Sequence, residues 1–163
     1  ALDRAIDDFT KTISLDPDFV QAYTERGTAY QDAGEFDRAI ADFTAAIRLN
    51  DAVAYLNRGN AYCLQRKYDL AINDYTTSIE LYPKSADPSG VQGLDCHYGS
   101  RGFAYYCKGE HDLAIVDFTE AIRLNPNAGK AYYSRGVVYR EKNEHAKAEA
   151  DFAKARELGF EPE

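Results

Sequence analysis

Apolar residues recur along the chain at spacings of three and four, as in Ile40, Phe43 and Ile47. This spacing places the apolar side chains on one face of a helix, so it predicts amphipathic helices. No segment alternates apolar and polar residues with a period of two, as a half-buried strand would. We therefore expect an all-α protein.

Two sequence blocks alternate along the predicted helices. The first, Tyr-x-x-Arg-Gly-x-x-Tyr, occurs four times, around Gly27, Gly59, Gly102 and Gly136. The second has the form Ala-Ile-x-Asp-Phe and a degraded last copy; its five copies begin at Ala5, Ala39, Ala71, Ala114 and Ala148. Internal repetition of this kind indicates a stack of similar units rather than one globule built around a single pocket.

Glycine and proline mark the turns between the predicted helices. Gly34 and Gly109 fit a left-handed cap after the first helix of a unit, and prolines are placed to stop the second helix at Pro17, Pro83 and Pro126. Each unit is therefore predicted to be a helix, a short turn and a second, antiparallel helix.

These blocks resemble the tetratricopeptide repeat (TPR) family. Its pattern of aromatic-x-x-Leu-Gly-x-x-Tyr, then Ala-x-x-x-Phe, then Pro matches Tyr23, Gly27, Tyr30, Ala39 and Phe43, and matches the three later units in the same way. Arg replaces the Leu of the family pattern in every unit. The resemblance covers nearly the whole chain and implies a right-handed superhelical α-α solenoid of about nine helices.

The resemblance predicts one repeat array over residues 1–163. We expect the second helix of a truncated repeat at 1–16, repeats at 18–50, 52–82, 95–125 and 127–159, and an inserted surface loop at 84–97. The glycine spacing is 34 between the last two units, 32 between the first two and 43 across the insertion. The short junction around Asn50 and Asp51 has lost its proline and is expected to turn more tightly, and the loop at 84–97 is a candidate for ligand contact.

Each recurring residue has a structural explanation. A glycine in the middle of a helix suggests that a neighbouring helix approaches too closely for a Cβ atom, with the recurring alanines as its small counterparts and aromatic side chains filling the space between. The recurring arginines and aspartates are most simply partly buried ion pairs, Arg with an Asp of its own or the preceding unit. The alternative is an arginine ladder that binds an anionic ligand.

In the family, the first helices of successive units line a concave groove that receives a peptide. The resemblance places this candidate groove at Thr24, Thr28, Gln31, Leu56, Asn57, Asn60, Cys63, Ser100, Phe103, Tyr106, Lys130, Tyr133, Val137 and Arg140. The groove changes from polar to apolar and aromatic along the chain. This suits a ligand with an apolar anchor, which we place near Leu56, Phe103, Tyr106 and Val137.

Two more specific sites are disfavoured. The carboxylate clamp of Lys, Asn, Asn, Lys and Arg that many family members use is matched only at Asn60 and Lys130 in one register and at Asn57 in another. Cys96-His97 with Cys107 and His111 makes a zinc site imaginable. The three cysteines lack Cys-x-x-Cys spacing, however, and fit small groove or core thiols in a reducing compartment better.

Composition narrows the partners further. Of 163 residues, 27 are acidic and 19 basic, and this net charge of −8 disfavours nucleic acid and favours basic or neutral peptides. Neither a membrane-spanning stretch nor a signal peptide is visible, so a cytoplasmic location is favoured, although localisation stays open. The absence of methionine and the start inside a helix indicate a piece of a longer protein.

The sequence predicts a non-catalytic module that binds a partner peptide or protein segment in its groove. No nucleophile triad, phosphate-binding loop or metalloprotease motif is present, and no cofactor is expected. One alternative is a self-assembling scaffold, because Ala5, Ile6, Phe9 and Ile13 of the first helix lack a covering helix. Another is the substrate-recruiting region of a larger enzyme.

Overall fold

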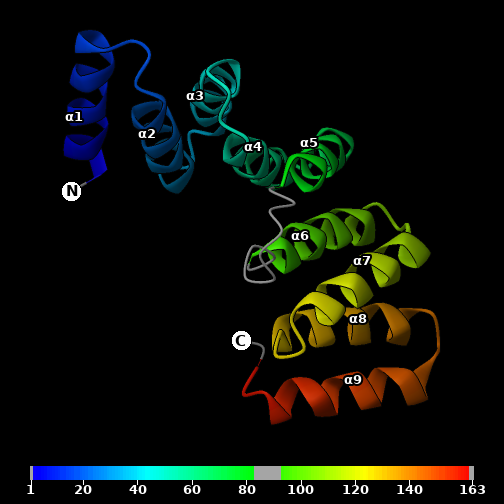
Figure 1. Cartoon of the computed structure of the whole chain (residues 1–163). Helices are drawn as coiled ribbons and strands as arrows, with labels where there is room; N and C mark the ends of the chain where they lie inside the picture. The colour runs from blue at the N-terminus through cyan, green and yellow to red at the C-terminus, as the bar shows by residue number, and fades with distance from the viewer. Residues whose placement is uncertain (1, 83–92, 162–163) are drawn as a thin grey trace. The chain divides into compact units, whose positions relative to one another are not determined.

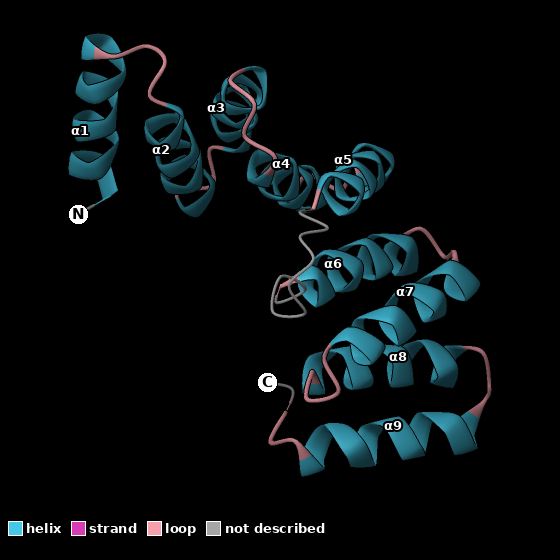
Figure 2. Ribbon diagram, in the orientation of Figure 1, coloured by secondary structure: helices cyan, strands magenta, loops and turns pink. Residues whose placement is uncertain are grey.

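A computed structural model describes residues 2–82 and 93–161 (Figure 1). These residues are helical apart from short connections, and they contain no strand (Figure 2). The described helices are α1 (Leu2–Leu15), α2 (Val20–Asp32), α3 (Phe36–Arg48), α4 (Val53–Leu64), α5 (Tyr68–Leu81), α6 (Leu94–Cys107), α7 (His111–Leu124), α8 (Gly129–Glu141) and α9 (His145–Glu157). The predicted all-α repeat fold is confirmed.

The chain divides into two compact units, residues 1–81 and 82–163. In each unit every helix packs against the helix before it and the helix after it, from α1 to α5 in the first and from α6 to α9 in the second. The first helix of each repeat is α2, α4, α6 or α8, and its antiparallel second helix follows a loop of three residues. Whether the two units form one continuous array stays a prediction.

The helix ends follow the predicted turn chemistry. Gly34 and Gly109 adopt left-handed backbone conformations, with φ of 77° and 80°, directly after the first helices of their repeats. Arg66 and Asn143 take the same conformation at the equivalent positions without glycine, with φ of 61° and 62°. Second helices end shortly before Pro17 and Pro126. Pro83 lies outside the described residues.

The short junction is not a tighter turn, contrary to our expectation. Four residues, 49–52, connect α3 to α4, the same number as in the proline-containing junctions at 16–19 and 125–128. Asn50 takes a left-handed conformation with φ of 69°, and the Asp51 carboxylate accepts a hydrogen bond from the backbone N–H of Val53 at 2.9 Å. These two features take the place of proline. The two residues by which this glycine spacing is shorter are missing from the helices and not from the junction.

The inserted loop is also shorter than predicted at its C-terminal end. Residues 94–97 form the first turn of α6, which begins after Gly93 with a left-handed φ of 100°. The remainder of the predicted loop, 84–93, falls outside the described residues except for Gly93 itself. The proposed contact between this loop and a ligand therefore stays a prediction.

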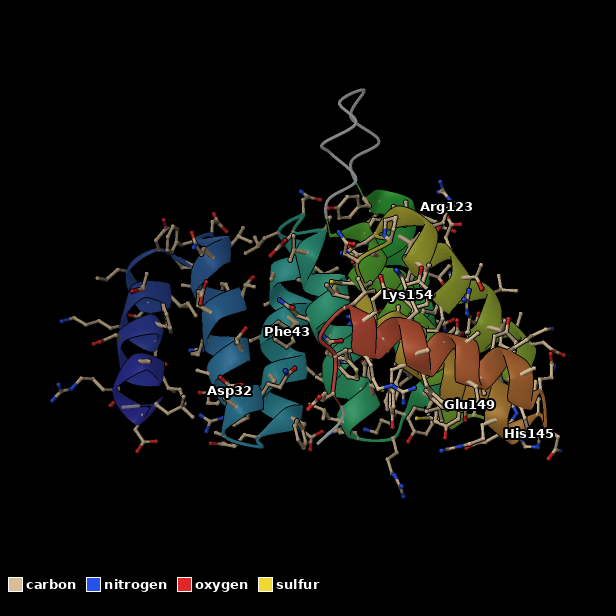
Figure 3. The ribbon with its side chains drawn as sticks, turned by 90° about the horizontal axis from the view of Figure 1, so that it is seen from below. Asp32, Phe43, Arg123, His145, Glu149 and Lys154 are labelled. Atoms are coloured by element: carbon tan, nitrogen blue, oxygen red, sulfur yellow. The ribbon has the colours of Figure 1, made fainter. Side chains whose placement is uncertain are left out.

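The core of each repeat is a glycine of the first helix packed against an aromatic ring of the second. A Cβ atom on Gly27 would lie 2.7 Å from Cε1 of Phe43, and one on Gly59 would lie 2.7 Å from Cε1 of Tyr75. The predicted close approach is confirmed, but the nearest neighbour is the ring and not the recurring alanine. The alanines are nevertheless buried, as Ala39 illustrates, and Phe43 lies among the helices of the first unit (Figure 3).

Replacing Gly27 by alanine tests this packing. Alanine favours a helix over glycine by about 0.5–1 kcal/mol, yet its Cβ would overlap a buried ring, and overpacking of a core typically costs about 1–3 kcal/mol. We expect Gly27→Ala to lower the free energy of unfolding measured by urea denaturation. Glu25→Ala, an exposed change on the same helix, is the control and should leave it within about 0.5 kcal/mol. An unchanged or raised stability of Gly27→Ala would contradict the packing.

Candidate functional site

The predicted groove residues lie on first helices, as expected from their positions. Within the first unit they occupy α2 and α4, and within the second unit they occupy α6 and α8. None is fully buried: Thr28, Phe103, Lys130 and Arg140 are exposed and the others are half-buried. The structure therefore presents two sets of candidate groove residues, one on each unit.

In the first unit, several of these side chains hold the scaffold itself. Thr24 Oγ1 donates a hydrogen bond to Asp51 Oδ2 at 2.8 Å, which ties α2 to the short junction after α3. Thr28 donates to the backbone carbonyl of Thr24 at 3.0 Å. Gln31 Oε1 is buried without a hydrogen-bond partner among the described residues. Thr24 is thus held in place by the fold, whereas the exposed Thr28 hydroxyl bonds only within its own helix.

A buried tyrosine of α5 contacts two more predicted groove residues, which lie on α4. Tyr75 is one of the recurring core aromatics, and its hydroxyl donates to Asn60 Oδ1 at 2.8 Å. It also forms a hydrogen bond with Cys63. Burial, with a smaller contribution from Cys63, raises the pKa of Tyr75 far above its usual value. Asn60 and Cys63 therefore satisfy a buried hydroxyl. The signal in the sequence was the Tyr at a position where other repeats have Phe.

The second unit carries an aromatic cluster on α6. The side chain of Phe103 is 48% exposed, and its ring centroid lies 6.4 Å from that of Tyr106. Tyr106 donates a hydrogen bond to Glu141 Oε1 at 2.6 Å, and its ring stacks on His111 at 6.0 Å. The hydrogen bond to Glu141, followed by burial, raises the pKa of Tyr106 to about 12. Glu141 also faces His111 Nε2 at 3.4 Å.

This cluster fixes the orientation of Tyr106, whereas the neighbouring Phe103 ring stays exposed. The charge of Glu141 and the ring of His111 flank Tyr106, so both are part of the same surface. His111 was missed as a member of this surface because the sequence suggested only a metal-binding role for it. Its position at the start of α7, directly after the turn at Gly109, was the available signal.

On α8, two predicted groove residues border a cavity that the sequence did not reveal. The Tyr133 ring lies 5.4 Å from the rings of both Phe152 and Phe160, and the Arg140 guanidinium lies 5.6 Å from the Phe152 ring. These side chains line a hollow of about 360 Å³. Among the neighbouring predicted residues, Lys130 is exposed and Val137 is half-buried.

The recurring arginines and aspartates form ion pairs within each repeat, as the structural interpretation predicted. Each Arg makes two hydrogen bonds of 2.7–2.9 Å to the carboxylate sixteen residues later: Arg26 to Asp42, Arg58 to Asp74, Arg101 to Asp117 and Arg135 to Asp151. The Asp side chains are only 4–9% exposed and the Arg side chains 16–18%. Hydrogen bonding to the carboxylate is the main cause that raises the pKa of each arginine.

The tyrosines of the repeated block complete this arrangement. The Arg58 guanidinium lies 5.6 Å from the Tyr55 ring and 5.9 Å from the Tyr62 ring, and the other three arginines are flanked in the same way. Arg58 also donates to Thr44 of the preceding repeat at 3.0 Å. Neutralised and enclosed in this way, the arginines hold the fold together and are not an anion-binding ladder.

The cysteines and histidines do not converge on a metal site in the part of the chain that the structure describes. His97 is buried with its ring edge-on to Tyr82 at 5.0 Å, and burial lowers the pKa of His97. Cys96 is exposed on the first turn of α6, and Cys63 and Cys107 are half-buried. No described helix has the length and apolar character needed to cross a membrane.

Paired helices, glycine-to-ring contacts and partly exposed first-helix side chains define a helical repeat protein. Family models agree with this: tetratricopeptide repeat models match residues 20–53 and 52–85, and a TPR repeat model matches 102–148. The chain belongs to the tetratricopeptide repeat family.

Solved structures share the fold of this chain. The chain is similar to the crystal structure of MamA, with 29% identity over 97% of this chain and 88% of that chain and a TM-score of 0.83. It is also similar to BtubC from P. vanneervenii, with 22% identity, 96% and 77% coverage and a TM-score of 0.79. It is similar as well to PilF of Pseudomonas aeruginosa, with 16% identity over 99% of this chain and 70% of that chain and a TM-score of 0.84. The last two likenesses concern the fold alone.

None of the curated proteins compared with the chain matches its sequence significantly. The repeat family and the likeness to MamA support a protein-protein interaction or scaffold module, a class that is typically non-catalytic.

Arg58→Ala tests the ion-pair assignment. Removing one partner leaves the buried Asp74 carboxylate uncompensated, which typically costs about 3–5 kcal/mol, so we expect a clearly lower melting temperature. Arg123→Ala, which breaks the exposed pair with Glu120, is the control and should change the melting temperature far less. An equal effect of the two changes would contradict the assignment.

Tyr75→Phe tests the buried hydroxyl through pH. The folded-state pKa of Tyr75 lies above its unfolded value near 10, so its contribution to stability is complete below about pH 10 and is lost as the pH rises further. The free energy of unfolding should therefore fall less steeply above about pH 10 in Tyr75→Phe than in the parent chain. Parallel alkaline profiles for the two chains would rule out this role.

Proposed function

We propose that the chain binds a partner peptide or protein segment on its first-helix surfaces, with the main anchor at Phe103 and Tyr106. The observation that carries this proposal is the exposure of the Phe103 ring on α6 beside a tyrosine whose orientation Glu141 fixes. A large apolar side chain on a rigid element, next to an oriented polar group, is typical of the anchor of an interface. An apolar ligand side chain packs against Phe103, and a ligand hydrogen bond reaches the Tyr106 and Glu141 pair.

Charge favours basic or neutral ligands along the first unit. Residues 1–81 contain 14 acidic and 8 basic side chains, and most of the net charge of the chain is located there. Glu25 and Asp32 are exposed on α2, next to the polar candidate residues Thr28 and Gln31. A ligand segment that meets α2 and α4 therefore gains from lysine or arginine, whereas one that meets α6 gains from an apolar side chain.

The second candidate function is self-assembly through α1, and the exposure of this helix favours it. Ala5, Phe9 and Ile13 are half-buried, whereas the equivalent Ala39 and Phe43 of the next repeat are almost completely buried. Asp8 makes no ion pair within residues 2–82 or 93–161, although every equivalent aspartate does. The apolar side of α1 thus leaves room for a second copy of the chain.

Loss of the anchor tests the groove proposal. Peptides selected on the parent chain from a display library should bind Phe103→Ala at least about tenfold more weakly, because truncation of a central aromatic anchor typically costs more than 1 kcal/mol. Val116→Ala removes a side chain that is 62% exposed on α7, a second helix, and serves as the matched control. Peptides that bind both variants as tightly as the parent chain would refute the anchor.

Light scattering over a concentration series tests self-assembly. If α1 mediates it, the average mass should rise with concentration in the parent chain, and Phe9→Ser should shift the rise to higher concentration because it removes exposed apolar area. A parent chain that stays monomeric at all concentrations would eliminate this second function.

A further inference from the structure

The hollow on the last repeat lies between α8, α9 and the segment that follows α9. Its walls are Tyr133, Arg140, Phe152, Ala155, Arg156, Phe160 and Glu161. Gly129 allows the closing segment to approach, because a Cβ atom there would lie 2.8 Å from Cβ of Phe160. At about 360 Å³, the hollow is at the small end of ligand-binding cavities and accommodates about one large side chain.

Two arginines border the hollow and neither forms an ion pair with a carboxylate of the described residues. The Arg140 guanidinium lies 5.6 Å from the Phe152 ring, and neither Arg140 nor Arg156 makes a side-chain hydrogen bond within 2–82 or 93–161. Both are exposed on the last two helices, whereas Arg135 on α8 is held by Asp151. Two free cations beside an aromatic cavity, in a chain of net charge −8, are a local exception to the acidic character of the molecule.

The arginines lie toward opposite ends of the hollow. Ala155 faces Gly129 at the start of α8, so Arg156 lies near that end, whereas Arg140 belongs to the last turn of α8. The Tyr133 ring packs against the Phe152 and Phe160 rings at 5.4 Å each, and Arg140 lies over the Phe152 ring. The hollow therefore combines an aromatic floor with a cation toward each end.

We propose that this hollow binds a short acidic peptide segment in which a large apolar side chain is flanked by carboxylates. The apolar side chain enters between the three aromatic rings, and the carboxylates pair with Arg140 and Arg156. Glu161 lines the same hollow and repels this ligand at the Arg156 end, so it lowers the affinity. The site shares Tyr133 and Arg140 with the proposed groove and in that respect rests on the proposed function, but it has its own ligand chemistry.

Matched peptides test the proposal on the full chain. The probe is acetyl-Asp-Phe-Asp amide, compared with acetyl-Asn-Phe-Asn amide, which lacks the charges, and acetyl-Asp-Ala-Asp amide, which lacks the anchor. Titrations followed by NMR should show the strongest binding for the first peptide, with shifted signals on α8 and α9. Added salt should weaken its binding, because exposed charge pairs are screened.

Substitutions separate the contributions. Arg140→Gln and Arg156→Gln should each weaken the aspartyl peptide about two- to fivefold, as expected for exposed ion pairs, and Glu161→Gln should strengthen it by a similar factor. Arg123→Gln is the control and should have no effect. Melting curves of all variants should match the parent, because these side chains are exposed or make no ion pair.

Equal binding of the aspartyl and asparaginyl peptides, or no saturable binding on α8 and α9, would overturn the proposal. So would an unchanged affinity in both arginine variants. Phe103→Ala separates this site from the α6 anchor: it should leave the aspartyl peptide bound as in the parent chain. A failure of the α6 anchor and a failure of this hollow are thus observed independently.

Discussion

Each repeat depends on a bidentate ion pair between an arginine of the first helix and an aspartate of the second. A buried carboxylate is tolerated only when its charge is compensated, and the arginine supplies both the charge and two donors. The same arginine contacts two tyrosine rings of its own helix, and Arg26, Arg58 and Arg135 also donate a hydrogen bond to a threonine of the preceding repeat. One side chain therefore fixes the helix pair and orients it against its neighbour.

The neighbouring glycine makes this geometry possible. Because Gly27 has no side chain, the Phe43 ring lies directly on the backbone of α2, and the two helices come close enough for Arg26 to reach Asp42. The repeated block thus encodes two coupled contacts, one steric and one electrostatic. Side chains on the exposed face of the first helices are not needed for either contact, so that face varies between repeats and carries the candidate binding chemistry.

The fold was predictable from the sequence, because repetition averages over local exceptions and isolates the residues that pack. The sites were less predictable. Asn60 and Cys63 occupy groove positions by register, yet both form hydrogen bonds with the buried hydroxyl of Tyr75. The hollow beside Arg140 depends on Phe160, which lies beyond the last helix and outside the repeat pattern. Such contacts depend on the actual neighbours in space, which periodicity does not specify.

In each repeat the repeated pattern places the arginine sixteen residues before its aspartate, although the spacing between repeats varies. The spacings of 32 and 43 residues between repeated glycines arise outside these Arg-to-Asp spans, so no span is lengthened or shortened. The stabilising contacts are therefore short in sequence, which lowers the contact order and favours rapid, stepwise folding that can begin at more than one repeat. Because these contacts are local, the connections between repeats can lengthen or shorten during evolution while the contacts inside each repeat stay unchanged.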